Sequence, residues 1–240
     1  YRLGDQDLSL FFGQSSFSQY VVTRASNAVV VDPEVDLTLL GPLGCGIQTG
    51  SGTVLNRLKP VVGESLVVFG CGAVGLSAIM AAKLTGCSHI IAVDIHASRL
   101  ALAGELGATH QINGKEQDAV AVIKQITGKG AHYAVETTGV SAIVLQAVHA
   151  VKPLGTVAIV GFTGDITLNV QNDLMAEGKS LVGVIEGDAV PALFIPLLVQ
   201  LYKQGKFPID KLIARYPLAD INQAFADSAS GKVIKPVVVM

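Results

Sequence analysis

Residues 65–75 constrain the fold most, because three glycines follow a short apolar run at a fixed spacing. The run SLVVFG predicts a buried strand, and AVGLSAIMAAKLTG (residues 73–86) has the apolar spacing of a helix that ends at a glycine. Gly70, Gly72 and Gly75 form a Gly-x-Gly-x-x-Gly pattern at the junction between the two. In that context the pattern is typical of a fold that binds a dinucleotide.

Each residue of this glycine junction has its own physical role. Gly70 allows a tight turn, Gly72 lets a pyrophosphate approach the backbone, and Gly75 lets the helix pack closely on the strand. The helix N-terminus offers free N–H groups and a partial positive charge to the phosphates. Asp94 ends the next apolar run, 19 residues after Gly75. A carboxylate there accepts the adenosine ribose hydroxyls and repels a 2′-phosphate, so the sequence predicts that NAD binds.

Short apolar runs alternate with helical patterns through the middle of the chain. Strands are expected at residues 65–70, 89–94, 108–113, 131–139, 156–161 and 180–187, and helices at residues 73–86, 98–107, 119–128 and 141–155. Alternation with short connections implies parallel strands joined by right-handed crossovers. The predicted fold class is therefore α/β, with a doubly wound parallel sheet of the Rossmann type.

The two ends of the chain have a different pattern. Residues 17–23 and 28–33 look like strands separated by turn residues, whereas the later end predicts a helix over 190–204 and a closing strand over 234–240. We expect the two ends to belong together as pieces of a second domain, around an inserted nucleotide-binding domain. The expected boundaries are residues 1–46, 47–185 and 186–240.

Composition argues against several kinds of partner. The net charge is −2 and no basic block is present, so nucleic acid is not an expected partner. No apolar run approaches the roughly 18–20 residues that span a bilayer, and no secretory leader is visible, so no membrane partner is expected. Three cysteines, an odd number, do not suggest a disulfide framework, and a cytoplasmic location is expected.

Cys45 stands between two glycines in GPLGCGIQTG (residues 41–50), and several motifs around it carry a family resemblance. GCGIQTGSG ahead of a helix, then VVFGCGAVGLSAIMAAKLTGCSHIIAVDI, ELGAT and a late GKVIKP occur in this order. By these motifs the chain resembles the zinc-dependent, medium-chain alcohol dehydrogenases over essentially its whole length. FFGQSSFSQYVV, VGVIEG and LYKQGKFPIDKLI look most similar to the aryl-alcohol (benzyl-alcohol) dehydrogenases.

The resemblance implies an oxidoreductase that transfers a hydride between a small, aromatic alcohol and NAD, with an aldehyde as the oxidised form. It also implies that Cys45 is a catalytic residue, the third protein ligand of a zinc ion that acts as a Lewis acid on the alcohol oxygen. Thr49, also assigned to the catalytic centre, and Val74 then border the nicotinamide of the cofactor.

Further cofactor contacts are implied by the same resemblance. Arg99 is expected near the adenosine ribose or its phosphate, and Lys235 near the pyrophosphate. Val160 and Phe162 are expected to present backbone groups to the carboxamide, and Ile185 to lie near the substrate pocket and a subunit contact. The family associates by extending the nucleotide-binding sheet through its last strand, so a homo-oligomer is expected.

The chain departs from the family pattern in one respect. The other two zinc ligands, the Gly-His-Glu segment and the proton relay of the family lie upstream of the motifs found here, and the five histidines lack metal-ligand spacing. The chain is therefore interpreted as a C-terminal fragment, whose ends are remnants of a β-rich, GroES-like catalytic domain. The 240 residues are expected to bind NAD(H), to hold no stoichiometric zinc and to oxidise no alcohol.

Three alternatives compete with this interpretation. A short-chain dehydrogenase would use a Tyr-x-x-x-Lys pair, and Tyr202 and Lys206 have that spacing, but Gly205 lies between them and the helix is ending there. A non-catalytic NAD(H)-binding module is the second alternative. A zinc-free quinone reductase of the same superfamily is the third; such enzymes usually use NADPH, so both Cys45 and Asp94 argue against it.

Overall fold

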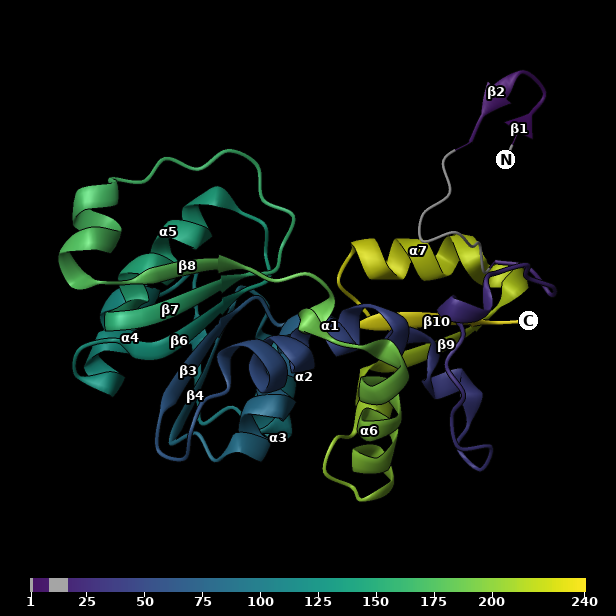
Figure 1. Cartoon of the computed structure of the whole chain (residues 1–240), viewed down its shortest axis with the longest axis horizontal. Helices are drawn as coiled ribbons and strands as arrows, with labels where there is room; N and C mark the ends of the chain where they lie inside the picture. Colours follow the sequence, from purple (N-terminus) through teal and green to yellow (C-terminus); the bar gives the residue numbers. More distant parts are fainter. Residues whose placement is uncertain (1, 9–16) are drawn as a thin grey trace.

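The computed structural model describes residues 2–8 and 17–240, and its centre is a six-stranded parallel sheet (Figure 1). The strand order is β5-β4-β3-β6-β7-β8. The bounds are β3 Ser65–Phe69, β4 His89–Asp94, β5 His110–Asn113, β6 Ala131–Glu136, β7 Val151–Ile159 and β8 Ser180–Gly183. The chain proceeds outward from β3 to β5, returns to β6 and proceeds to the other edge, so the order reverses between β3 and β6. This confirms the predicted doubly wound sheet.

Helices cover both faces of the sheet (Figure 1), with α2 and α3 on one face and α4 and α5 on the other. Their bounds are α2 Ala73–Thr85, α3 Ala97–Leu106, α4 Ala119–Thr127 and α5 Ser141–Ala150. Alternate residues of β3 serve the two layers: Leu66 and Val68 pack with α2, while Val67 and Phe69 pack with α4 and α5. All of β3 is buried, which explains why the strand reads as a continuous apolar run.

Several boundaries differ from the prediction: the strands expected over residues 108–113, 131–139 and 180–187 are shorter, and the boundary between α5 and β7 is displaced. The helix expected over residues 141–155 ends at Ala150, and β7 begins at Val151. Pro153 has no backbone N–H and disfavours helical geometry in the residue before it, so the helix stops ahead of it. Val151 pairs instead with Ala131, after which the register shifts before the pair Tyr133 and Thr156.

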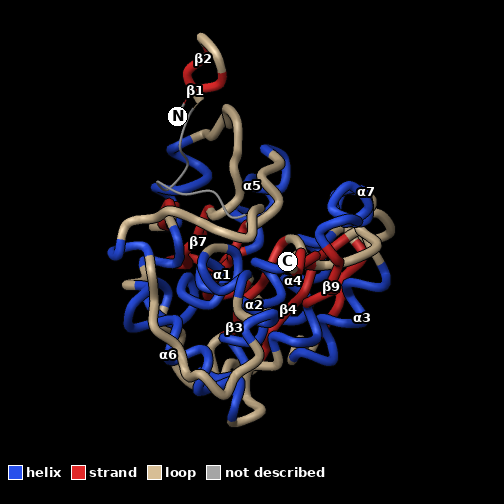
Figure 2. Tube along the Cα trace, turned by 90° about the vertical axis from the view of Figure 1, so that its right-hand side faces the viewer, coloured by secondary structure: helices blue, strands red, loops and turns tan. Residues whose placement is uncertain are grey.

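The other helices and strands lie toward the two ends of the chain. They are β1 Arg2–Leu3, β2 Gln6–Asp7, α1 Gly46–Gly52, α6 Pro191–Lys203, β9 Ile213–Pro217, α7 Ile221–Ala229 and β10 Lys235–Val239. Short 3₁₀ turns occur at Ala25–Asn27, Leu37–Leu39, Gly41–Gly44, Met175–Glu177, Glu186–Asp188, Ile209–Leu212 and Leu218–Asp220, and π-helical turns at Thr53–Leu58 and Val170–Leu174. Strands β9 and β10 pair in parallel as a separate sheet, and the β1–β2 pair projects away from the other elements (Figures 1 and 2).

The strands expected at residues 17–23 and 28–33 do not form. A strand needs a neighbour for its backbone groups, and none of the sheets in the described part of the chain includes either segment. Residues 32–36 nevertheless contact the later end of the chain through two ion pairs. Asp36 pairs with Arg215 of β9 at 2.9 Å, and Asp32 pairs with Lys203 of α6 at 2.5 Å.

Helix α1 connects this part of the chain to the large sheet. A Cβ atom on Gly50 would lie 1.9 Å from the Val74 carbonyl oxygen, and one on Gly52 would lie 2.4 Å from the Gly187 carbonyl oxygen. The two glycines therefore let α1 approach both the start of α2 and the turn after β8. As a result, Gly46 and Gly50 of α1 lie beside Val74 in the first turn of α2.

Candidate functional site

A cavity of about 630 Å³ opens at the carboxyl ends of β3 and β6, where the strand order reverses. Ligands of open α/β sheets bind in a crevice at this position. The predicted cofactor residues that line the cavity are Gly70, Gly72, Val74, Asp94, Arg99 and Lys235. The structure thus brings together residues from the β3–α2 junction, α2, β4, α3 and β10.

The three glycines of the junction have different surroundings. A Cβ atom on Gly75 would lie 1.8 Å from the carbonyl oxygen of Gly70. Gly70 has a φ of +91°, and a Cβ atom there would lie 2.6 Å from the Thr137 hydroxyl oxygen. A Cβ atom on Gly72 would meet no protein atom within 4 Å. Packing within the protein therefore requires Gly70 and Gly75, whereas Gly72 faces open space in which a ligand fits.

Asp94 is 8% exposed, and both of its carboxylate oxygens are engaged by backbone groups. Its Oδ2 accepts the N–H of Cys71 at 2.6 Å, and its Oδ1 accepts the N–H groups of Ile95 and His96 at 2.7 and 2.9 Å. These bonds fix the carboxylate at the edge of the cavity. Carboxylate oxygens have several acceptor positions, so ribose hydroxyls can still donate to them.

Two cationic side chains face the cavity from different segments. The Nε atom of Arg99 is buried and has no hydrogen-bond partner in the part of the chain that the structure describes. Lys235 lines the cavity from the first position of β10. A buried donor without a partner is costly, so the position of Arg99 suits an anionic or polar ligand.

Sequence reasoning missed the wall that follows β6. Thr137 and Thr138 line the cavity, and the Thr137 hydroxyl donates to the carbonyl oxygens of Phe69 and Gly70 at 2.9 and 3.1 Å. The fully buried Glu136 carboxylate accepts the N–H of Thr138 at 2.6 Å. Polar residues directly after a central strand were the available signal in the sequence, since that strand end meets the end of β3.

Val160 and Phe162 are not among the residues that line the cavity. The N–H of Val160 donates to the Glu136 carbonyl oxygen at 2.9 Å, and the Phe162 side chain is fully exposed. Their backbone contacts with a cofactor therefore stay a prediction. Ile185 is 82% exposed beyond the end of β8.

Cys45 lies just outside the cavity, next to Gly46, which lines it. Cys45 is exposed as a whole, but neighbouring atoms partly shield its sulfur from water. This partial burial raises the pKa of the thiol. The Glu186 carboxylate, 3.4 Å from the sulfur, raises the pKa further, while Lys235 opposes the shift. The same carboxylate accepts the Thr49 hydroxyl at 3.4 Å. Sequence reasoning did not identify Glu186.

The residues near Cys45 do not complete a metal site. Across residues 2–8 and 17–240, no three His, Cys, Asp or Glu side chains are grouped so that they could hold a metal ion. Cys45 and Glu186 offer one thiol and one carboxylate, whereas a catalytic zinc has three protein ligands. The residues described here supply only part of such a site.

The Tyr-x-x-x-Lys pair of a short-chain dehydrogenase is not formed. Helix α6 ends at Lys203, and Gly205 has a φ of +68°. Tyr202 and Lys206 therefore do not share one helix face, as that mechanism requires. In addition, neither residue lines the cavity.

The sheet, the glycine junction and the Asp94 carboxylate at the strand-order reversal define a Rossmann-type nucleotide-binding domain. Residues 73–203, more than half of the chain, match the zinc-binding dehydrogenase family. The chain belongs to this family, and the resemblance inferred from the motifs is confirmed.

Similar proteins support the same assignment. The geraniol dehydrogenase of Castellaniella defragrans is 44% identical over 237 residues, which are 96% of this chain and 63% of that protein. A benzyl alcohol dehydrogenase structure from Acinetobacter calcoaceticus has a TM-score of 0.92 and 52% identity, covering 95% of this chain and 64% of that one. The structure of an alcohol dehydrogenase zinc-binding domain protein from Burkholderia ambifaria has a TM-score of 0.93 and 52% identity. The match covers 96% of this chain and 63% of that one. The chain thus spans less than two thirds of these relatives.

Among the described residues, no helix has both the length and the apolar character needed to cross a membrane.

Proposed function

We propose that this chain forms the NAD-binding part of an alcohol dehydrogenase, which transfers a hydride between an alcohol and NAD. The observation that carries the proposal is the cavity, which is lined by Gly72 with open space before it, by the Asp94 carboxylate and by the cationic side chains of Arg99 and Lys235. Such an arrangement is complementary to a ribose next to a pyrophosphate. When bound, NAD supplies the ring that accepts the hydride.

The side chains of this chain bind and orient the cofactor. Asp94 accepts the adenosine ribose hydroxyls, and its charge disfavours the 2′-phosphate of NADP. The N–H groups at the start of α2 and the cations of Arg99 and Lys235 stabilise the pyrophosphate. Gly46, next to Cys45 in the sequence, and Val74 both line the cavity, and we expect the nicotinamide end of the cofactor to lie there.

In the whole protein we propose a catalytic zinc with Cys45 as one of its ligands, and a small aromatic alcohol as substrate. Thiolate sulfur is a preferred zinc ligand, which suits Cys45. The benzyl alcohol dehydrogenase structure, with 52% identity over 95% of this chain, supports the aromatic class. The geraniol dehydrogenase at 44% identity makes geraniol the substrate to compare with it.

We further propose that the protein is a cytoplasmic homo-oligomer that associates through β8. This strand is at the edge of the sheet, where its outer backbone groups are available to another strand. Ile185, 82% exposed, would be covered by such a contact. The domain division proposed from the sequence, residues 1–46, 47–185 and 186–240, is kept.

Titration of the purified chain with NADH and NADPH, followed by cofactor fluorescence, tests the proposal. We expect NADH to bind at least about tenfold more tightly, because the buried Asp94 carboxylate meets either a hydroxyl donor or a phosphate. Equal affinity for the two cofactors would contradict the assignment. Turnover of benzyl alcohol and geraniol by the full-length protein then tests the substrate class.

A further inference from the structure

The carboxylate of Glu186 contacts the first turn of α1 from a segment far away in the sequence. Its Oε2 accepts the Gln48 side-chain N–H at 3.0 Å and the Thr49 hydroxyl at 3.4 Å, and its Oε1 lies 3.4 Å from the Cys45 sulfur. Gln48 is 2% exposed and also donates to the Gly44 carbonyl oxygen at 3.0 Å. One carboxylate therefore joins Cys45, Gln48 and Thr49, which lie close in sequence to Gly46, a residue that lines the cavity.

The turn that carries Glu186 has an unusual backbone conformation. Glu186, Gly187 and Asp188 have φ angles of 50°, 69° and 49°. Two of these are residues with side chains in the left-handed region, which such residues rarely adopt. Conformations of this kind persist where the surroundings enforce them, and they concentrate at functional sites.

Contacts with α1 and the turn after it hold this conformation in place. Gly187 and Gly52 approach so closely that a Cβ atom on Gly52 would lie 2.4 Å from the Gly187 carbonyl oxygen. The Asn56 side-chain N–H donates to the same oxygen at 3.0 Å, and Arg57 pairs with Asp188 at 3.4 Å. The backbone of Glu186 is thus fixed from both sides, and its carboxylate is directed at Thr49.

We propose that Glu186 is a positioning residue for the nicotinamide end of the cofactor and acts through Thr49; this inference rests on the proposed function. A threonine hydroxyl has one hydrogen to donate, and here Glu186 accepts it. The Thr49 oxygen then presents only lone pairs to a ligand. The N–H donor at that end of NAD is the carboxamide NH₂ group, which an acceptor of fixed orientation would select.

The inference is tested on this chain with two ligands, NADH and ADP-ribose, which lacks the nicotinamide. We expect Glu186→Gly to weaken NADH binding about fivefold and to change ADP-ribose binding less than about twofold, since one hydrogen bond is lost at one end only. Thr49→Val should have the same effect, and the double variant should be no weaker than either single one, because both act through one contact.

Two further variants separate positioning from folding. Glycine is favoured at a φ of 50°, so Glu186→Gly relieves strain as it removes hydrogen bonds, and its melting midpoint should stay within about 3 °C of the parent. Glu186→Gln keeps an acceptor oxygen and should restore NADH affinity to within about twofold. Glu177→Gln, the same substitution at a residue that does not line the cavity, should leave binding of both ligands unchanged.

The outcomes distinguish this inference from the proposed function. If the parent chain binds NADH and Glu186→Gly binds it equally well, the inference is overturned and the proposed function stands. An equal loss of NADH and ADP-ribose binding would also overturn it, because the effect would then not be confined to the nicotinamide end. Failure of the parent chain to bind NADH would overturn both.

Discussion

The Asp94 carboxylate accepts the backbone N–H of Cys71 at 2.6 Å, which ties the end of β4 to the middle of the glycine junction. Cys71 is itself fully buried, and burial, with Asp94 next to it, raises the pKa of its thiol. Asp94 therefore has two effects in the proposed function: it fixes the backbone expected to face the pyrophosphate, and it offers acceptors to the ribose. A substitution at Asp94 acts on both.

Asp94→Ser should therefore change cofactor preference and stability together. We expect the preference for NADH over NADPH to fall about tenfold, because the charge that repels a 2′-phosphate is removed. The free energy of unfolding should fall by about 1.5–3 kcal/mol, because backbone N–H groups lose a charged acceptor. Cofactor titration and urea unfolding measure the two effects. Asp118→Ser removes the same charge but keeps a capping oxygen at the start of α4, and it should alter neither.

The glycine junction allows a paired test of ligand contact against packing. Gly72→Ala should fold with a free energy of unfolding within about 0.5 kcal/mol of the parent, since nothing lies within 4 Å of the new Cβ atom and its φ of −77° suits alanine. It should nevertheless bind NADH at least about tenfold more weakly, because the methyl group occupies space that the pyrophosphate needs.

Gly75→Ala is the counterpart of that variant. Its Cβ atom would lie 1.8 Å from the Gly70 carbonyl oxygen, so α2 must shift away from β3 and the free energy of unfolding should fall by about 3 kcal/mol. Thermal unfolding of the two variants and NADH titration of Gly72→Ala make the comparison. A Gly72→Ala variant that binds NADH as the parent does would show that the ligand does not approach this backbone.

Local patterns in the sequence were sufficient to predict the sheet and the junction. The residues of β3 are buried on both faces, so their apolar character shows without periodicity, and the glycine spacing has its meaning within a few residues. Glu186 could not be found in this way, because it lies 141 residues from Cys45 and meets it only after β8 has joined the sheet. The prediction of strands at residues 17–23 and 28–33 was wrong for a related reason, because pairing partners elsewhere in the chain decide whether such segments become strands.

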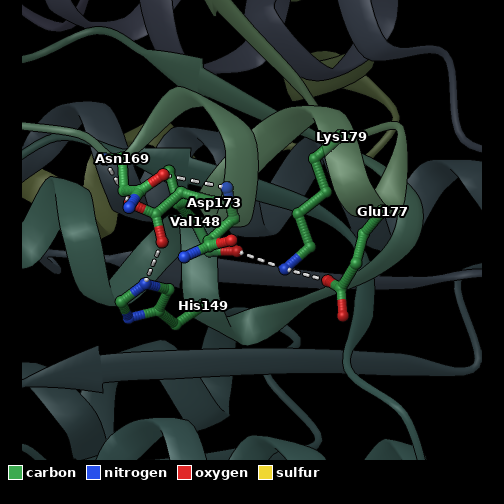
Figure 3. Close-up of polar contacts among 7 residues, drawn as sticks. Val148, His149, Asn169, Asp173, Glu177 and Lys179 are labelled. Atoms are coloured by element: carbon green, nitrogen blue, oxygen red, sulfur yellow. Dashed lines mark hydrogen bonds and ion pairs between the residues drawn. The ribbon is translucent and has the colours of Figure 1, made fainter.

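A polar cluster joins the end of α5 to residues 169–179 and gives an acid-dependent contribution to stability (Figure 3). The Nε2 atom of His149 lies 3.0 Å from the Asp173 Oδ1 atom, and Asp173 Oδ2 accepts the Asn169 N–H at 2.9 Å. Lys179 pairs with Glu177 at 2.6 Å in the same cluster. The hydrogen bond from His149, followed by the one from Asn169, lowers the pKa of Asp173 from 3.8.

A lowered pKa in the folded state means that Asp173 stabilises the fold above its unfolded-state pKa and loses this contribution as the pH falls through its folded-state pKa. We therefore expect the urea midpoint of Asp173→Asn to fall less steeply than that of the parent below about pH 4. Asp220→Asn, at the start of α7 where the carboxylate makes no capping bond, should keep the slope of the parent. If the urea midpoints of Asp173→Asn and the parent fell equally steeply with pH, Asp173 would make no such contribution.

In the described part of the chain, Cys45 has Glu186 beside it but no third ligand-type side chain. An open zinc site needs three protein ligands in fixed geometry. Metal binding must also displace the thiol proton, and burial and Glu186 oppose this because they raise the pKa of Cys45. We therefore expect the purified chain, after dialysis, to hold at most about one-tenth of a zinc ion and to oxidise no benzyl alcohol, while it still binds NADH. In the full-length protein, Cys45→Ala should remove the catalytic zinc, whereas Cys87→Ala should not. One zinc ion per purified chain, lost in Cys45→Ala, would mean that these residues complete the site by themselves.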